Sequence, residues 1–386
     1  MNSLVSKILC VVLLSCSSSI DAAEMKIISG RAMGTSYTLK LASQSQTTSL
    51  HEASTLVKNE LERIEAIFSL YRTESELSRW NAAREGEWLE VSEDLYRVTE
   101  FAIELSHQTD GAFDPTIGPL MELWQLNSLS ASWQPPTTEA IQETKKMIGV
   151  SQIELRAAPH AIRKRSGMVK LDLNALVEGW AIDRVRSLLE DHRYRDFLFE
   201  LGGEFGAGGR SNQASMWRVG IEDPRNPARL ISKVTINNEA LCTSGSTKQG
   251  RVYRKTRYSH ILDPTSGRPI DHELAAVSVL HPKAMFADGW STALMVLGQQ
   301  EGMLLAEQKG LIASFVGATP KASQTSSTTF AVYRFEPASN EMSPAGWISK
   351  VAFGLMCVLL VGLAALFGFW FFLGIEPHWG HASMPE

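Results

Sequence analysis

Cysteine is scarce in this chain, and the positions of the few cysteines exclude both a disulfide framework and a zinc site. Of 386 residues four are cysteine: Cys10 and Cys16 lie in an N-terminal leader, and Cys357 lies in a C-terminal apolar run. Cys242 is therefore the single cysteine of the body, where an intradomain disulfide is excluded. The sequence contains no CxxC pair and no cysteine–histidine cluster with zinc-ligand spacing.

An excess of positive charge is also lacking. The chain has 37 Lys and Arg against 42 Asp and Glu, which gives a formal net charge of -5. This mild acidic balance argues against nucleic acid as a partner. The body, residues 24–336, has no internal linker and no low-complexity run, so its roughly 310 residues are expected to form one large core or two interlocked halves.

The N-terminal residues 1–23 are typical of a secretory signal peptide. A single lysine, Lys7, precedes a short apolar stretch and then small residues. The stretch that ends in Cys16 could be a lipoprotein cleavage site with the lipid on that cysteine, and cleavage near Ala22 or Ala23 without lipid is the alternative. Either interpretation predicts export of the body.

Residues 351–375 form an uncharged apolar run that is long enough to span a bilayer with some tilt. Trp347 and Trp379 flank it as interfacial anchors. The sequence therefore predicts a tether at 337–350, one transmembrane helix at 351–375 and a short tail at 376–386. Export would put Lys350 on the outer side, against the positive-inside tendency, but one lysine is weak evidence against a signal sequence.

Within the body, apolar spacing changes between the periods of helices and strands without strict βαβ alternation, which favours an α+β fold. Helical spacing occurs at 49–70, 92–108, 118–126, 138–147, 175–190 and 299–309. Strand patterns occur at 25–42, 153–155, 168–173, 197–201, 216–222, 230–236, 258–262, 275–280, 311–316 and 329–335.

The most informative segment is Ala284–Gly298, which predicts a helix opened by Ala287 and Asp288. Asp288 and Thr292 are spaced i, i+4, so both oxygens project from one face. A carboxylate and a hydroxyl near the positive end of a helix suit a hard cation that also contacts phosphate. The alternative is that Asp288 caps the helix and Thr292 packs in the core.

Two further segments suggest where phosphate groups could lie. The glycine-rich stretch 202–209 lacks the order of GxGxxG and precedes a strand pattern, so it is interpreted as a turn that allows close backbone approach. In the segment 171–183 a strand is expected to end at Asp172 and a helix to start near Ala175. Strand-to-helix corners bind phosphates, although an ordinary acidic helix cap is the alternative there.

One histidine and one phenylalanine are candidates for proton transfer and ring binding. His260 lies in an expected strand before a Pro/Gly turn, where it could accept a proton from an incoming hydroxyl or serve a structural role. Phe113 lies in the turn Asp110–Thr116, where it could hold an aromatic ring or be buried at the entry of a helix.

Taken in this order, these segments resemble the ApbE family of flavin transferases from about Met33 to Val316. The matching segments are MGTSY at Met33, Ser69-Leu70-Tyr71 with Ser75 and Asn81, DGAFDPTIGPL, LDLNALVEGWAID, YSHILDPTSGRPI and ADGWSTALMVLG. The resemblance implies one large T-fold-like α+β domain of two interlocked halves. It also implies Mg2+-dependent transfer of FMN from FAD to a Thr or Ser hydroxyl of a target protein, with release of AMP.

The resemblance assigns roles to individual residues. Asp288, Thr292 and the main-chain carbonyl of Ala175 would be metal ligands, whereas Ser291 stands at a position that is acidic in some relatives, so no metal role is expected for it. His260 would be the general base. The FAD pocket would be lined by Met33, Tyr71, Ala112, Phe113, Asp114, Asp172, Glu178 and Ile270.

Partners and location also follow from the resemblance. Family acceptors include exported subunits of sodium-pumping quinone reductases and of Rnf-type electron-transport complexes. A membrane anchor would raise the local concentration of the enzyme around such targets, with the catalytic domain on the periplasmic side of a bacterial inner membrane. Two other functions stay open at this point: an FAD diphosphatase that gives FMN and AMP, and a non-catalytic, membrane-bound FAD-binding protein.

Overall fold

The computed structural model describes residues 25–42, 49–126, 132–212, 215–224, 226–246, 250–318, 325–327 and 335–337. Helices and strands are mixed along these residues, as the α+β prediction requires. The helices are α1 (Leu50–Phe68), α2 (Glu76–Ala82), α3 (Glu93–Gln108), α4 (Gly118–Trp124), α5 (Thr138–Lys145), α6 (Asn174–Asp191) and α7 (Ala284–Gln308), with a 3-10 turn at Val150–Gln152.

The centre of the fold is an eight-stranded sheet in which all neighbouring strands are antiparallel. In sheet order the strands are β1 (Lys26–Ala32), β2 (Thr35–Leu41), β6 (Phe197–Leu201), β7 (Glu204–Gly208), β10 (Ala240–Gly245), β15 (Leu274–His281), β16 (Ile312–Gly317) and β17 (Thr325–Ser326). The first four strands precede residue 209 in the chain, and the last four follow residue 239. The pairing of β7 with β10 therefore joins two halves into one sheet.

Smaller sheets and hairpins surround this centre. One three-stranded sheet has the order β18 (Phe335–Pro337), β9 (Asn226–Ile236), β8 (Trp217–Asp223), and another has the order β3 (Leu89–Glu90), β5 (His160–Lys164), β4 (Ile153–Ala157). Two separate hairpins are β11 (Gly250–Tyr253) with β12 (Thr256–Ser259), and β13 (Leu262–Asp263) with β14 (Arg268–Pro269).

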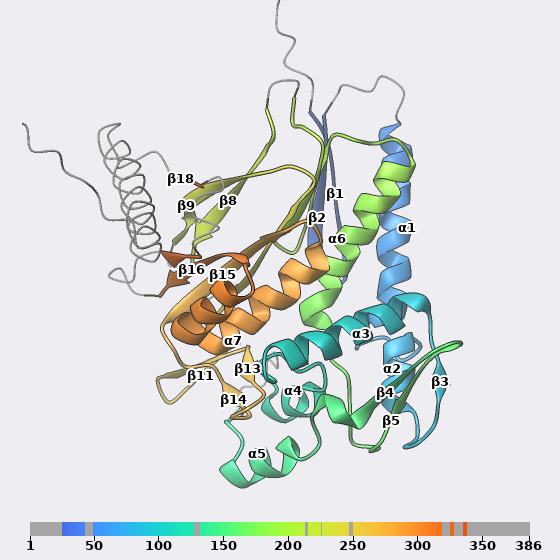
Figure 1. Cartoon of the computed structure of the whole chain (residues 1–386), viewed down its shortest axis with the longest axis vertical. Helices are drawn as coiled ribbons and strands as arrows, with labels where there is room; N and C mark the ends of the chain where they lie inside the picture. Colours follow the sequence, from blue (N-terminus) through green and yellow to red (C-terminus); the bar gives the residue numbers. More distant parts are fainter. Residues whose placement is uncertain are drawn as a thin grey trace, which may run out of the picture.

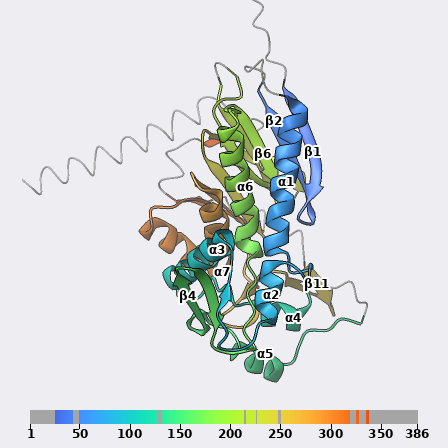
Figure 2. The same ribbon diagram turned by 90° about the vertical axis from the view of Figure 1, so that its right-hand side faces the viewer.

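Helices α1, α6 and α7 cover one face of the large sheet, as Figures 1 and 2 show from two sides. In β6, Phe197 and Phe199 belong to the core under these helices, whereas Leu198 between them belongs to a second core with Trp217 of β8. Since successive strand side chains point to opposite faces, the sheet has apolar cores on both sides.

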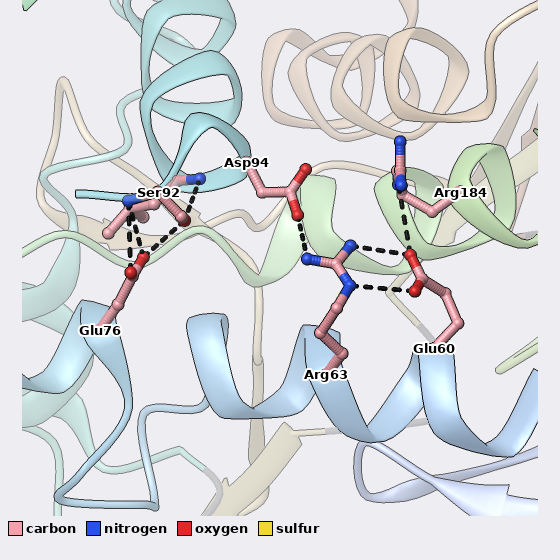
Figure 3. A network of polar contacts seen from close by, with 7 residues as sticks. Glu60, Arg63, Glu76, Ser92, Asp94 and Arg184 are labelled. Atoms are coloured by element: carbon pink, nitrogen blue, oxygen red, sulfur yellow. Dashed lines mark hydrogen bonds and ion pairs between the residues drawn. The ribbon is translucent and has the colours of Figure 1, made fainter. Parts of the chain in front are cut away.

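A polar network ties three of the helices together (Figure 3). Arg63 of α1 contacts Asp94 of α3 and donates to Glu60 at 2.7 Å, and Glu60 also accepts from Arg184 of α6 at 3.2 Å. The hydrogen bond from Arg63 lowers the pKa of Glu60, which keeps this carboxylate charged. The network fixes α1, α3 and α6 relative to one another beside the large sheet.

The predicted strand at 168–173 is wrong. This segment forms no ladder; instead the Asn81 side chain donates to the Leu171 carbonyl at 2.9 Å and accepts from the Leu171 amide at 2.8 Å. The amide group of Asn81 therefore satisfies the backbone groups that a neighbouring strand would otherwise pair. Its alternating apolar residues are buried at Val169, Leu171 and Leu173, so the segment resembles a strand in the sequence.

The prediction that Ala287 and Asp288 open a helix is also wrong, because α7 begins at Ala284. Its first amides, those of Ala284 and Met285, donate to the Asp183 carboxylate at 2.8 and 3.0 Å. Asp183 thus caps the helix, and Asp288 lies in the second turn. The helix predicted separately at 299–309 is the second part of α7, which continues past a non-helical Gly298.

The expected strand at 258–262 is interrupted at His260, which lies between β12 and β13. The signal peptide at 1–23 and the transmembrane helix at 351–375 lie outside the described residues, as do the tail and all of the tether except Pro337. Among the residues that the structure does describe, no helix is long and apolar enough to cross a membrane.

The close crossing of α6 and α7 predicts that Gly179→Ala destabilises the fold. A Cβ at Gly179 would lie 2.6 Å from the Ala284 carbonyl oxygen and 2.8 Å from the Asp288 Cβ, so the helices would have to move apart. We expect a loss of about 1–3 kcal/mol in the free energy of unfolding, measured by urea denaturation. Gly167→Ala is the matched control, because its Cβ would lie 4.0 Å from the nearest atom, the Glu85 Cβ. Equal stability of the two variants would contradict the prediction.

Candidate active site

One large cavity, of about 890 Å³, gathers most of the residues singled out in the sequence. Ten of the twelve line it: Met33, Tyr71, Ala112, Phe113, Asp114, Asp172, Ala175, Glu178, His260 and Thr292. Asp288 and Ile270 do not line it. The cavity is near the upper end of the range of about 300–1,000 Å³ that is typical of small-molecule sites.

Two tight hairpin turns bring backbone to the cavity. Met33 and Gly34 connect β1 to β2 with φ values of 52° and 77°, and Gly202 and Gly203 connect β6 to β7 with 65° and 103°. A side chain on Gly202 would meet the Glu178 carboxylate at 2.4 Å, so glycine is needed there. The glycine-rich stretch is therefore a hairpin turn at the cavity and not a phosphate loop, as the sequence indicated.

The crossing of α6 and α7 positions Asp288 just behind the cavity wall. Its carboxylate accepts a hydrogen bond of 3.0 Å from the Gly179 amide, and its side chain is buried. In a regular helix the Gly179 amide donates to the carbonyl of Ala175. This amide also donates to Asp288. The Ala175 carbonyl oxygen, which lies at the cavity, can therefore bind another group as well.

Hydroxyl groups surround the Thr292 end of the site. The Ser244 hydroxyl, on β10, lies 2.8 Å from the Thr292 hydroxyl and 2.8 Å from the Ser291 hydroxyl. Ser291 in turn donates to the Asp288 carbonyl at 2.9 Å. Ser244 therefore connects the sheet to α7 and fixes the side chain of Thr292 at the cavity.

The pKa values of three carboxyl groups at the site are raised by burial and by neighbouring carboxylates. Burial and the Glu200 carboxylate raise the pKa of Glu178 to about 7, and burial together with Glu178 raises the pKa of Glu204 to about 8. Burial and then the carboxylates of Glu204 and Glu178 hold the pKa of Asp288 well above its usual range. The site thus accumulates negative charge when these groups ionise, and a bound cation would relieve it.

Asp114 and Asp172 lie in two neighbouring turns of the cavity wall. Asp114 accepts from the amide and the hydroxyl of Thr116 at 2.8 and 2.6 Å, and Asp172 accepts from the Asn174 amide at 3.0 Å. The Asp172 amide donates to the Pro115 carbonyl at 2.8 Å, which joins the two turns. Burial raises the pKa of both aspartates.

The two aromatic residues differ in exposure. Phe113 is buried and belongs to the main core, whereas Tyr71 is 88% exposed at the cavity. The Ser69 hydroxyl accepts from the amides of Tyr71 and Arg72, each at 3.2 Å, which shapes the turn that carries the ring. An exposed ring on a structured turn can close over a planar ligand.

His260 and Ile270 come from the β13–β14 region. His260 lines the cavity with Ile261, and the Ile270 amide donates to the Ile261 carbonyl at 3.1 Å. Ile270 packs against the main core, so it supports the cavity wall from behind.

The sequence matches the model of the ApbE family over residues 33–315. The chain belongs to the ApbE family. The family is thus confirmed as the one that the ordered motifs indicated.

This ApbE-family chain has curated relatives and solved structural neighbours. It is 33% identical over 286 residues to an FAD:protein FMN transferase of Vibrio cholerae, a match that covers 74% of this chain and 85% of the relative. The structure matches a flavin transferase ApbE from Vibrio cholerae with a TM-score of 0.72 and 31% identity, over 81% of this chain and 99% of the other. A flavinyl transferase ApbE of Pseudomonas stutzeri, in its apo form, matches with a TM-score of 0.73 and 32% identity, over 80% and 96%.

The residues predicted to bind a metal can be tested for chemical fit. Asp288, Thr292 and the Ala175 carbonyl offer oxygen donors only, which are the donors that Mg2+ prefers. Seven carboxyl groups line the cavity, namely Glu65, Asp114, Asp172, Glu178, Glu200, Glu204 and Glu222. Arg72, also in the lining, is paired with Glu62 and Glu65. The donor set and the surrounding charge thus fit a hard cation, although the described residues contain no cluster of three His, Cys, Asp or Glu side chains arranged as a metal site.

Sequence reasoning missed Ser244 and Glu204 of this site. Ser244 is the second-last residue of β10, a strand that the sequence analysis did not predict, and no motif marks it. Glu204 directly follows the two turn glycines, and its carboxylate accepts a hydrogen bond of 3.0 Å from the Thr243 amide. A polar residue directly after a glycine turn was the available signal for Glu204.

The raised pKa of Glu204 predicts a pH-dependent penalty for folding in the metal-free protein. Below the unfolded value of 4.5 both states are protonated, and between 4.5 and about 8 the unfolded state ionises first, so folding stability falls as pH rises. We expect Glu204→Gln to stabilise the protein in chelator by up to about 5 kcal/mol above pH 8, with the gain vanishing near pH 4.5.

Thermal and urea unfolding across this pH range measures the effect. Glu87→Gln, at an exposed carboxylate outside the cavity, is the matched control and should leave stability unchanged at every pH. A gain in Glu204→Gln that is independent of pH would contradict the assignment to ionisation.

Proposed function

We propose that this chain transfers the FMN part of FAD to a Ser or Thr hydroxyl of a target protein. The acceptor oxygen forms a bond to the phosphorus next to riboflavin, the bond between that phosphorus and the bridging oxygen breaks, and AMP leaves with the bridging oxygen. The hydroxyl proton goes to a base. This reaction needs a pocket for a dinucleotide, a base at its edge and neutralisation of the diphosphate charge.

The main support for the proposal is that His260, Thr292 and the turns of Tyr71 and Phe113 all line one cavity. The curated relatives that cover most of the chain are FAD:protein FMN transferases, which supports the same reaction here. His260 would accept the proton of the acceptor hydroxyl, and Tyr71 would pack on a ring of the flavin nucleotide. The Gly202–Gly203 turn would let the substrate approach the backbone closely.

We further propose that Asp288, Thr292 and the Ala175 carbonyl hold Mg2+. When bound, this ion would neutralise charge on the diphosphate oxygens of FAD. Ser244 would keep the Thr292 hydroxyl in place, and the Gly179 amide would orient the Asp288 carboxylate by their bond of 3.0 Å. The same carboxylate-rich wall would repel a diphosphate without a cation, which makes activity dependent on the metal.

The test uses purified protein, FAD, Mg2+ and an acceptor that carries an exposed Ser/Thr site. We expect acceptor mass to increase by one FMN, with AMP released in equal amount. His260→Ala should lower the rate by about a hundredfold to ten-thousandfold. Asp288→Asn, which keeps the shape but removes the charge, should raise the Mg2+ concentration needed for half-maximal rate.

His107→Ala, an exposed histidine on α3, is the matched control and should keep full activity. Free FMN and AMP with unlabelled acceptor would instead identify a diphosphatase. Retention of FAD without either product would identify a binding protein.

We also propose that residues 351–375 anchor the chain in a bacterial inner membrane, with the catalytic domain in the periplasm after export. The uncharged run and the signal-like residues 1–23 support this arrangement. Exported flavin-acceptor subunits of quinone reductases or Rnf-type complexes would then be the targets. An enzyme held at the same membrane would meet them at a raised local concentration.

Cell fractionation tests this location. We expect the full chain in the membrane fraction and a chain ending at residue 336 in the soluble periplasmic fraction, with cleavage of the catalytic domain by protease added to spheroplasts. A full chain in the cytoplasmic soluble fraction would contradict both the anchor and the export.

A further inference from the structure

The β11–β12 hairpin carries a concentration of positive charge in a chain that is acidic overall. Residues 251–258 contain four cations and no acidic residue, whereas the formal net charge of the chain is -5. Arg254, Lys255 and Arg257 are exposed. Figure 2 shows β11 near the right-hand edge of the molecule.

The tip of this hairpin holds two cations in a backbone conformation that they do not favour. Tyr253 pairs with Thr256, so Arg254 and Lys255 form a two-residue turn, with φ values of 47° and 73°. Turns of this geometry favour asparagine and glycine, because a Cβ is crowded at positive φ. Backbone strain of this kind is characteristic of functional segments. In this hairpin the two strained residues are the two cations of the turn.

One face of the hairpin packs against Trp133, so the opposite face points away from that ring. The Trp133 ring lies 5.6 Å from the Tyr258 ring and 6.3 Å from the Tyr253 ring, and the Arg251 guanidinium lies 5.2 Å from the Trp133 ring. Val252 and Arg257 are cross-strand partners on the opposite face, where Val252 is 67% exposed. The hairpin therefore presents an ordered surface of one apolar and several cationic side chains.

This surface leads directly to the site of the acceptor hydroxyl. Strand β12 ends at Ser259, and the next residue is His260 at the cavity. At about 3.3 Å per residue, Arg257 lies roughly 10 Å and the tip roughly 17 Å from His260 along the strand. An extended segment of a partner protein with its hydroxyl at His260 would reach both within about five residues of that hydroxyl.

We propose that the β11–β12 hairpin is the docking surface for the acceptor protein, and that it binds acidic side chains within about five residues of the acceptor hydroxyl. This inference rests on the proposed function. None of the described residues that line the cavity belongs to 250–259, so the cations of the hairpin are not part of the cavity wall proposed to bind FAD. In this proposal the carboxylate-rich cavity binds the metal and the nucleotide, and the cationic hairpin binds the acceptor protein.

The experiment measures binding of fluorescent peptides to the full chain with FAD and Mg2+. Each peptide has one central threonine flanked by Glu, by Gln or by Lys. We expect the Glu peptide to bind most tightly and to weaken with added salt, since the contacts are exposed charge pairs. The double variant R254E/K255E should weaken Glu-peptide binding about tenfold and strengthen Lys-peptide binding.

The matched control is K58E/K309E, which makes the same change in net charge at exposed lysines outside the cavity, on α1 and at the end of α7. It should bind all three peptides as the unchanged protein does. FAD binding, followed by flavin fluorescence, should be unchanged in both variants. Equal binding of the Glu and Lys peptides, or equal effects of the two double variants, would overturn the proposal.

Two further readouts separate this inference from its alternatives. If R254E/K255E loses binding to vesicles of anionic phospholipid but keeps Glu-peptide binding, the hairpin contacts a membrane and the proposal is wrong. FMN transfer to an intact acceptor tests the proposed function separately. An unchanged protein that labels no acceptor refutes the function, whereas labelling at an equal KM for the acceptor in R254E/K255E refutes only the docking surface.

Discussion

The site depends on one close contact, the crossing of α6 and α7 at Gly179. Because Gly179 has no side chain, its amide can reach the Asp288 carboxylate at 3.0 Å across the two helices. That bond fixes Asp288 and leaves acceptor capacity on the Ala175 carbonyl at the cavity. Asp183 caps α7 from α6 at the same crossing, so the helix that carries Asp288 and Thr292 is held at its start as well. The other elements, including the polar network of α1, α3 and α6, position this pair of helices.

The electrostatics of the site follow from burial. Partial or full burial raises the pKa values of Glu178, Glu204 and Asp288, and neighbouring carboxylates raise them further. Such a group of acids costs folding free energy near neutral pH unless a cation binds. The proposed reaction needs a cation at the same place, so the feature that weakens the metal-free fold would favour the loaded enzyme. The hairpin with Arg254 and Lys255 lies outside the cavity lining, so its positive charges do not neutralise the carboxylates there.

Much of the fold and most members of the candidate site could be predicted from the sequence, since amphipathic helices such as α1 and alternating strands such as β1 leave strong periodic signals. The exceptions have physical causes. In the segment at 168–173 the backbone of Leu171 is paired by the Asn81 side chain, and periodicity does not distinguish that from a ladder. The start of α7 was misplaced because its cap, Asp183, is distant in the sequence. Ser244 was missed since its importance lies in contacts that only the folded sheet creates.

The cavity is assembled from segments that span most of the body, from the Met33 turn to Thr292 on α7. A piece of the chain that contains the ring-bearing turn, the helix crossing and the base must run at least from Tyr71 to Asp288. A nascent or truncated chain that lacks α7 therefore has no proposed metal site, however well its earlier helices have formed. If the proposed function is right, consumption of FAD would begin only after α7 has docked, so the topology would delay it until most of the body has been synthesised.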